Sequence, residues 1–282
     1  MLNILLFLAG WFKLILLKFL ICLRKVLYMQ IEILGSGTSM GVPMVGCDCR
    51  VCQSTDPRDK RTRTSVIIKV NGKQILIDTS ADYRQQMLRA EIKDLDAVLY
   101  THYHVDHILG MDDLRSLNII NKKSIPIYAS KDTMEILKRV FSYAFSDQAY
   151  ISSVPRIIPR TISSESFTID NIDIIPIPLL HGNLLIYGFR IGDFAYCTDV
   201  SEIPDASYRL LKDLKVLILG ALRYKPHPTH FTIDEAVQEA QKIEARQTYF
   251  THLSHGVLHE EAEKQLPDKI KLSYDGLQLT LD

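Results

Sequence analysis

The sequence predicts an α/β protein in which two β-rich halves form a layered sandwich. Three observations support this fold class. From Met29 onward, short apolar runs with strand character alternate with helical stretches. Between residues 165 and 198, four strand-like runs follow one another with no helical pattern between them. The composition, 47% hydrophobic and 23% charged in 282 residues, suits one large α/β domain or two small ones.

The N-terminal half is expected to begin with a strand at 30–34, followed by an aperiodic segment at 35–63. A loop of that length inside a compact domain usually has a function or is held in place by a cross-link such as a bound metal ion. A hairpin should follow, because Asn71-Gly72 is a strong turn signal between the strand-like runs 65–70 and 73–78. The remaining elements of this half alternate between helix and strand, at 82–90, 97–100, 112–118, 126–129 and 132–145.

The C-terminal half opens with residues 150–163, whose Pro, Ser and Ile content predicts irregular structure. Strand-like runs follow at 165–169, 172–178, 184–191 and 193–198. The chain is then expected to alternate between helix and strand, at 205–213, 216–220, 233–243, 248–251 and just after His259.

Residues 1–28 form an apolar extension, distinct from the body at 29–282. They contain four basic residues, no acidic residue and the only tryptophan, Trp11. No basic stretch precedes the apolar run and no small-residue cleavage site follows it, so the extension does not fit a secretory signal. Three interpretations remain: a start-site artefact with translation beginning at Met29, a membrane anchor that leaves the body in the cytoplasm, or an amphipathic surface helix.

The charge balance argues against a protein that binds nucleic acid over its whole surface. The chain has 33 basic and 33 acidic residues. Residues 29–282 retain 29 basic and 33 acidic residues, a net charge of −4. A protein that grips many phosphates needs a basic surface, which this balance does not provide.

The sharpest chemical signal is the run THYHVDH at 101–107, directly after the predicted strand 97–100. Alternate residues of an extended chain point the same way, so His102 and His104 can bind one ion together. Asp106 and His107 follow after the chain turns and can face a second ion. Imidazole and carboxylate ligands suit zinc, and also manganese or iron.

The same pattern recurs at the ends of other strands. The apolar runs AVLYT, FAYCT and TYFT precede His102, Asp199 and His252, and the run ILI ends at Asp78. His181 follows another strand-like run. Strands that each deliver a ligand-type residue at the same end build one shared cleft.

The long loop contains a second constellation, Cys47, Cys49 and Cys52. Three cysteines in six residues have the spacing of a thiolate metal site, and His255 is the best candidate for a fourth ligand. Such a zinc would staple the 35–63 loop to the segment that carries His252. The alternative is a set of unligated or redox-reactive cysteines.

This set of residues resembles the metallo-β-lactamase superfamily over nearly all of 29–282, with its motifs in the family's order. The resemblance implies an αββα four-layer sandwich with two metal ions. It assigns His102, His104 and His181 to one ion, Asp106, His107 and His252 to the other, and Asp199 to both. Asp78 would lie behind the ligands and orient them.

The runs GSGTSMGVPMVGCDCRVC, RTRTSVII, THYHVDHILGMDDLR and THLSH look like one branch of the superfamily. That branch is the PhnP-like cyclic-phosphate phosphodiesterases of the carbon–phosphorus lyase pathway. Its members pair the two-metal site with a Cys3His structural zinc, which Cys47, Cys49, Cys52 and His255 match. His230 looks like the family's catalytic histidine and is preferred over the nearby His227. His227 and His259 are expected at the surface.

The resemblance implies a binuclear phosphodiesterase that opens a small cyclic phosphate diester, similar to phosphoribosyl cyclic phosphate, to a phosphomonoester. A hydroxide shared by two zinc or manganese ions would attack phosphorus, and His230 would protonate the leaving oxygen or stabilise its charge. Arg61 and Arg63 could meet a substrate phosphate, although solvated charges beside a strand are the preferred interpretation.

Three other functions stay open. The first is a tRNA 3′-processing endonuclease, which would need a basic arm that the chain does not show. The second is a hydrolase of carbon esters, thioesters or lactams. The third is a zinc-stapled interaction domain without catalysis. The expected partner is a small phosphodiester, with nucleic acid disfavoured and a homodimer open. The expected location is the cytoplasm, with a membrane contact only through residues 1–28.

Overall fold

The computed structural model describes residues 28–146 and 153–282. The predictions for the apolar extension concern residues that lie almost wholly outside this range. Among the described residues, no helix combines the length and apolar character needed to cross a bilayer.

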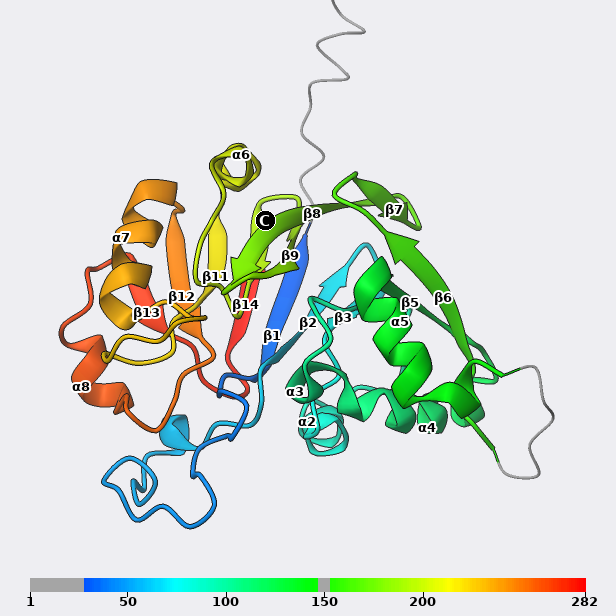
Figure 1. The fold of residues 1–282 in the computed structure, drawn as a ribbon, viewed down its shortest axis with the longest axis horizontal. Helices are drawn as coiled ribbons and strands as arrows, with labels where there is room; N and C mark the ends of the chain where they lie inside the picture. The colour runs from blue at the N-terminus through cyan, green and yellow to red at the C-terminus, as the bar shows by residue number, and fades with distance from the viewer. Residues whose placement is uncertain (1–27, 147–152) are drawn as a thin grey trace, which may run out of the picture.

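Two seven-stranded sheets form the centre of the molecule (Figure 1). The first has the strand order β14-β1-β2-β3-β4-β5-β6. Its strands are β1 (Met29–Gly35), β2 (Ser65–Val70), β3 (Lys73–Ile77), β4 (Ala97–Leu99), β5 (Ile125–Ser130), β6 (Ile157–Ile162) and β14 (Gln278–Leu281). The β2–β3 hairpin turns at Asn71 and Gly72, both with positive φ, as predicted for this dipeptide.

The second sheet has the order β13-β12-β11-β10-β9-β8-β7. Its strands are β7 (Phe167–Ile169), β8 (Ile172–His181), β9 (Leu184–Ile191), β10 (Phe194–Cys197), β11 (Val216–Gly220), β12 (Gln247–Thr251) and β13 (Ile270–Leu272). Strands β10 to β13 run parallel, as do β3 to β6 in the first sheet. Parallel strands deliver the residues that follow them to one edge, and this arrangement builds the site.

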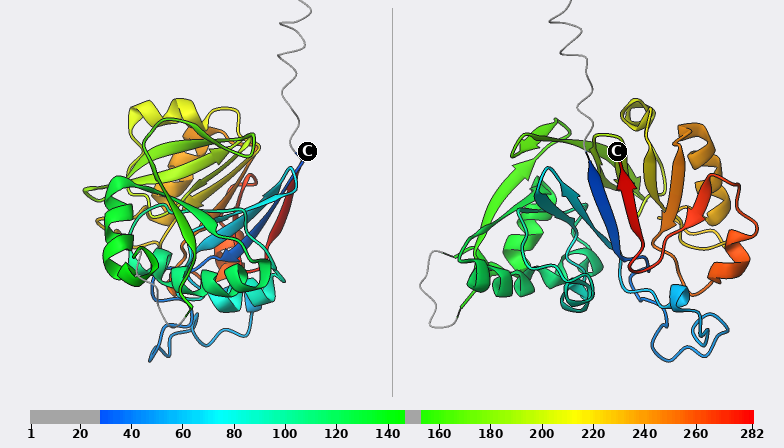
Figure 2. Two further views of the ribbon diagram at one scale, coloured as in Figure 1. Left: turned by 90° about the vertical axis from the view of Figure 1, so that its right-hand side faces the viewer. Right: turned by 180° about the vertical axis from the view of Figure 1, so that it is seen from behind.

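Helices cover the outer face of each sheet (Figures 1 and 2). Against the first sheet lie α2 (Tyr83–Arg89), α3 (Val105–Ile108), α4 (Leu114–Asn121) and α5 (Lys131–Val140); against the second lie α6 (Asp205–Tyr208), α7 (Ile233–Ile243) and α8 (His259–Glu263). Short 3-10 turns occupy Pro57–Asp59, Leu109–Asp113, Ser142–Ala144 and Arg209–Leu211. The predicted four-layer αββα sandwich is confirmed.

Alternation along the central strands explains why both faces of each sheet are buried. In β2, Val66 and Ile68 enter the core between the two sheets, whereas Ile67 packs under the helices of the first sheet. In β11, Ile218 enters the core between the sheets and Leu217 packs against the outer helices of the second. The sandwich therefore contains three stacked apolar layers.

Two sequence-based expectations were wrong or incomplete. Residues 157–162, expected to be irregular, form the edge strand β6, which pairs in parallel with β5. Four of its six residues are exposed, so the usual burial pattern of a strand is missing. The strands β13 and β14 were not expected at all, although β14 pairs antiparallel with β1 and so joins the first and last strands of the described residues.

Candidate metal centre

Three of the predicted ligand-type residues follow strands in a backbone conformation that L-residues rarely adopt. Asp78, Asp199 and His252 come directly or almost directly after β3, β10 and β12, with φ values of 62°, 59° and 61°. Non-glycine residues in the left-handed region are uncommon and concentrate at functional sites. The abrupt turn there carries each side chain to the same edge of the sandwich.

The structure brings the seven predicted metal ligands into two groups. In each group, one ligand atom from every residue lies within 4.8 Å of the others. The first group comprises His102, His104, His181 and Asp199, and the second comprises Asp106, His107, Asp199 and His252. Asp199 belongs to both groups, which is the placement expected for a bridging carboxylate.

Hydrogen bonds on the far side of the imidazole rings set their orientation. The Nδ1 of His181 donates to the carbonyl oxygen of Thr229 at 2.6 Å, and the Nδ1 of His107 donates to Asp78 Oδ2 at 2.7 Å. These bonds leave Nε2 of each ring as the atom available to a metal ion, which can bind there once that nitrogen carries no proton.

The third oriented ring is that of His102, which Thr101 connects to Asp78. Thr101 Oγ1 donates to Asp78 Oδ2 at 2.8 Å and is 3.0 Å from His102 Nδ1. Since the hydroxyl hydrogen is used on the carboxylate, the hydroxyl oxygen accepts from His102 Nδ1. Asp78 thus orients a ligand-type ring in each group.

The donor set fits divalent cations. His107 Nε2 and both ring nitrogens of His252 are buried without a hydrogen-bond partner in the structure. A buried polar atom without a partner is costly, and a cation at the centre of the second group would satisfy His107 Nε2 and one nitrogen of His252. Burial lowers the pKa of His102 well below its usual value, so its ring is neutral and able to coordinate.

The carboxylates of the two groups are held in their charged form. Desolvation would raise the pKa of Asp199, but His252 and His107 outweigh it and keep that pKa well below the usual range. Asp106 has its pKa lowered in the same way by His107. Burial would lower the pKa of His107, but Asp199, Asp106 and Asp78 outweigh it and hold that pKa well above the usual value, so a cation bound here would displace the proton of that ring. Carboxylates beside imidazoles are the ligands that zinc, manganese and iron accept.

The cysteine constellation also comes together. The Sγ atoms of Cys47, Cys49 and Cys52 lie 3.2, 3.5 and 3.7 Å from Nδ1 of His255. The pKa of Cys49 is lowered to about 6, chiefly because the backbone N–H of Cys52 donates to its sulfur. A cysteine that ionises near neutral pH, beside two further cysteine sulfurs and an imidazole nitrogen, suits a tetrahedral zinc.

Arg61 was wrongly interpreted as a solvated charge. Its side chain is 0% exposed and pairs at 2.9 Å with Asp59, which is 1% exposed. Its Nη1 donates to the carbonyl oxygen of Ser254 at 3.1 Å, and the other face of Asp59 accepts from Ser54 Oγ at 2.7 Å. The pair therefore fastens the cysteine loop to the segment between His252 and His255.

Arg63 is also engaged within the protein. Its Nη1 lies 3.1 Å from Asp82 Oδ1, and its Nε donates to the carbonyl oxygen of Ser39 at 3.0 Å. Neither Arg61 nor Arg63 lines the large pocket described next.

A pocket of about 500 Å³ lies next to His230, although none of the seven residues of the two histidine groups lines it. His230 and His255 line it, so it borders the histidine groups as well as the cysteine site. The His230 ring lies 4.5 Å from that of His181 and 4.8 Å from that of His252, between centroids. Burial lowers the pKa of His230 to about 2, which keeps the ring neutral.

The structure differs from expectation for the two remaining histidines. His227 was expected at the surface, but it is half-buried and lines the same pocket, with its ring 5.0 Å from that of His230. His259, also expected at the surface, is 1% exposed, and its backbone N–H donates to Asp59 Oδ1 at 2.9 Å. The sequence around His259 is acidic and gives no sign of this burial.

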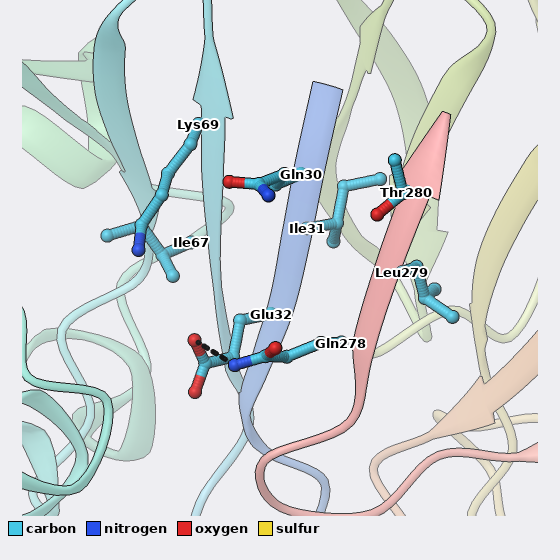
Figure 3. A pocket seen from close by; sticks show the side chains of 8 residues that line it. All are labelled: Gln30, Ile31, Glu32, Ile67, Lys69, Gln278, Leu279 and Thr280. Atoms are coloured by element: carbon cyan, nitrogen blue, oxygen red, sulfur yellow. Dashed lines mark hydrogen bonds between the residues drawn. The ribbon is translucent and has the colours of Figure 1, made fainter. Parts of the chain in front are cut away.

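A second pocket, of about 80 Å³, lies on the outer face of β1, β2 and β14 (Figure 3). Gln278 Nε2 donates to Glu32 Oε2 at 3.3 Å there, and Lys69 approaches from β2. No histidine or cysteine lines this pocket, so it is separate from both candidate metal sites.

The model of the β-lactamase superfamily domain matches residues 73–253, more than half of the chain. The chain therefore belongs to the metallo-β-lactamase superfamily. Within it, the chain is PhnP-like: it is 47% identical to a crystal structure described as a new diphosphatase from the PhnP family, with a TM-score of 0.85 over 90% of this chain and 98% of that one.

Among curated proteins, the chain is 40% identical over 257 residues to the octanoyltransferase of Porphyromonas gingivalis, covering 90% of this chain and 52% of that protein. It is 28% identical over 149 residues to ribonuclease Z of Clostridium acetobutylicum, covering 50% and 48%. The chain spans about half the length of the curated relatives it matches. The short form of human tRNase Z, 17% identical with a TM-score of 0.67 over 90% of this chain and 99% of that one, shares the fold.

Proposed function

We propose that this protein is a metal-dependent hydrolase of phosphoric diesters that opens a small cyclic phosphate to a phosphomonoester. One observation carries the proposal: donor atoms from four separated stretches of chain converge in two groups that share Asp199, beside a pocket that His230 lines. That arrangement is suited to holding two cations and a phosphate at once.

The chain's own residues have distinct roles in this proposal. The first group of ligands and the second would each hold one zinc or manganese ion, and Cys47, Cys49, Cys52 and His255 would hold a structural zinc. Two ions in the histidine groups would supply Lewis acidity and a hydrolytic water of lowered pKa. Asp78 orients His102 through Thr101 and His107 directly.

His230 would act on the leaving oxygen. Because its ring is neutral, it can donate an N–H hydrogen bond to an oxygen that gains negative charge. Of the two roles expected for this residue, charge stabilisation is better supported than proton donation from an imidazolium.

A second candidate reaction is hydrolysis of a diphosphate. The 47% identical relative is described as a diphosphatase, and a phosphoric anhydride presents the same tetrahedral phosphorus and anionic oxygens to the site. The octanoyltransferase is about twice as long as the segment it shares with this chain, so its name does not assign an activity here. The net charge of −4 on residues 29–282 continues to disfavour tRNA.

A substrate panel tests the proposal. Cyclic ribose phosphates, cyclic nucleotides, linear dinucleotides, a nucleoside diphosphate and precursor tRNA would each be assayed with zinc and with manganese. We expect the highest kcat/KM for a cyclic diester. Turnover of the diphosphate alone would favour the second candidate, and failure to hydrolyse any phosphate ester with either metal would refute both.

A further inference from the structure

The turn between β11 and α7 forms one wall of the large pocket. Arg223, Lys225 and His227 line the pocket from this turn. The turn is braced by Arg223 itself, whose Nε donates to the carbonyl oxygen of Lys225 and whose Nη2 donates to that of Pro226, both at 3.1 Å. A capping box formed by Thr232 and Glu235 fixes the start of α7 just beyond.

The positive charge of this wall has no acidic partner inside the pocket. No aspartate or glutamate occurs among the described residues that line the pocket. Within the described part of the chain, neither Arg223 nor Lys225 has a carboxylate oxygen within ion-pair distance. By contrast, Arg61 and Arg63 are paired with Asp59 and Asp82. Asp234 and Glu261 act electrostatically on Tyr224 in this turn, but neither of them lines the pocket. The side of the turn that faces the pocket therefore carries positive charge, which attracts anions.

His227 adds a neutral donor to the same wall. Its Nδ1 accepts from the backbone N–H of Thr229 at 3.3 Å, so Nδ1 carries no hydrogen. The proton of the neutral ring is therefore on Nε2, which makes that atom a hydrogen-bond donor. The ring lies 5.0 Å from that of His230, so this donor is adjacent to the histidine that borders the metal-ligand groups.

We propose that Arg223, Lys225 and His227 form a phosphate-binding wall that holds a substrate phosphate other than the one that reacts beside His230. The wall supplies two cations and one N–H donor, the chemistry that recognises a phosphate dianion. It would select substrates with two phosphate groups over those with one. This inference rests on the proposed hydrolysis of phosphate compounds at the adjacent site.

ADP and AMP test the wall, because they share one nucleoside and differ by one phosphate. Their dissociation constants would be measured by calorimetry with metal in excess, and as inhibition constants against bis(p-nitrophenyl) phosphate. We expect the wild-type protein to bind ADP about tenfold more tightly than AMP. The ADP-to-AMP ratio is the affinity for ADP divided by the affinity for AMP. Arg223→Ala and Lys225→Ala should each reduce this ratio several-fold, and the double variant should bring it to about one. Added salt should reduce the ratio as well, because the preference for ADP depends on charge.

One control and two further variants make the result specific. Lys69→Ala removes a lysine from the remote pocket of Figure 3 and should keep the ADP-to-AMP ratio. Arg223→Lys keeps the charge but loses the geometry of the brace, so it separates the effect of charge from collapse of the turn. His227→Phe removes the neutral donor and should weaken ADP more than AMP.

An ADP-to-AMP ratio near one in the wild type, or an unchanged ratio in the double variant, would overturn the wall. Hydrolysis of bis(p-nitrophenyl) phosphate by the wild type distinguishes this failure from failure of the proposed function. If that hydrolysis occurs and the wild type binds ADP and AMP with equal affinity, only the phosphate-binding wall is wrong. If it is absent with both zinc and manganese, the proposed function itself is wrong.

Discussion

Asp78 Oδ2 accepts a hydrogen bond of 2.7 Å from His107 Nδ1, and both side chains are 0% exposed. The same oxygen accepts from the hydroxyl of Thr101, and Oδ1 accepts from the backbone N–H of Thr101. Asp78 therefore touches no expected metal position itself, yet it fixes the ring of a residue that does. Its left-handed backbone is the cost of placing a carboxylate there.

We predict that Asp78→Ala weakens metal binding at the histidine groups by about 10- to 100-fold, because His107 and His102 lose their oriented tautomers. Chelator competition monitored by metal analysis would measure this. Asp170→Ala is a matched control, since Asp170 also has a positive φ of 46° but lies exposed in the β7–β8 turn. Equal loss of metal in both variants would contradict the orienting role.

His104→Ala should abolish hydrolysis of bis(p-nitrophenyl) phosphate while leaving the far-ultraviolet circular dichroism spectrum unchanged. His104 is only half-buried, so its loss removes a ligand atom without opening the core. Val105→Ala, at the neighbouring exposed position, should keep the rate within about twofold of wild type, since isolated surface substitutions are usually mild. Retained turnover in His104→Ala would refute the two-metal assignment.

Cys49→Ser should lower both the melting temperature and the metal content, from about three ions per chain to about two. A serine hydroxyl does not ionise near neutral pH, so it is a poor substitute for the thiolate. Cys197→Ala serves as the control, because Cys197 is buried in the apolar core and belongs to no candidate metal group. An unchanged melting temperature and metal content in Cys49→Ser would argue against a structural zinc.

Arg61→Met should destabilise the protein by about 3–5 kcal/mol, because it leaves the Asp59 carboxylate buried without its partner. Urea unfolding monitored by fluorescence would measure the loss. The double variant Arg61→Met, Asp59→Asn should be less destabilised than the sum of the single variants, since both charges are gone. Lys264→Ala removes one partner of an exposed ion pair with Glu260 and should leave the midpoint unchanged. If Arg61→Met also left the unfolding midpoint unchanged, the Arg61–Asp59 pair would not stabilise the cysteine loop.

Most of the site could be predicted because its ligands are local to strand ends. His102, Asp199 and His252 each follow an apolar run ending in Thr, and the parallel direction of the strands brings those ends together. Their use as metal ligands stays a prediction, as do the catalytic role of His230 and the structural zinc at Cys47, Cys49, Cys52 and His255. What the structure adds is that these side chains are close enough to act together.

The parts that the sequence did not predict depend on distant contacts. Arg61 is followed by another arginine two residues later, a pattern typical of solvent exposure, and only the fold reveals Asp59 and Ser254 around it. β14 was missed because its partner β1 lies at the opposite end of the body. The turn at 223–227 reads RYKPH, which is polar or basic apart from one tyrosine and one proline, so nothing local shows that it faces a pocket.

Cys47 and His255 are separated by 208 positions in the chain, although their side chains meet. During synthesis, the ribosome adds about two hundred further residues after the three thiols before it reaches their histidine. Contacts between such distant positions form slowly. The nascent protein therefore has a period in which these sulfurs are open to oxidation or to capture of a stray ion, and its yield should respond to the zinc supply of the cell during synthesis.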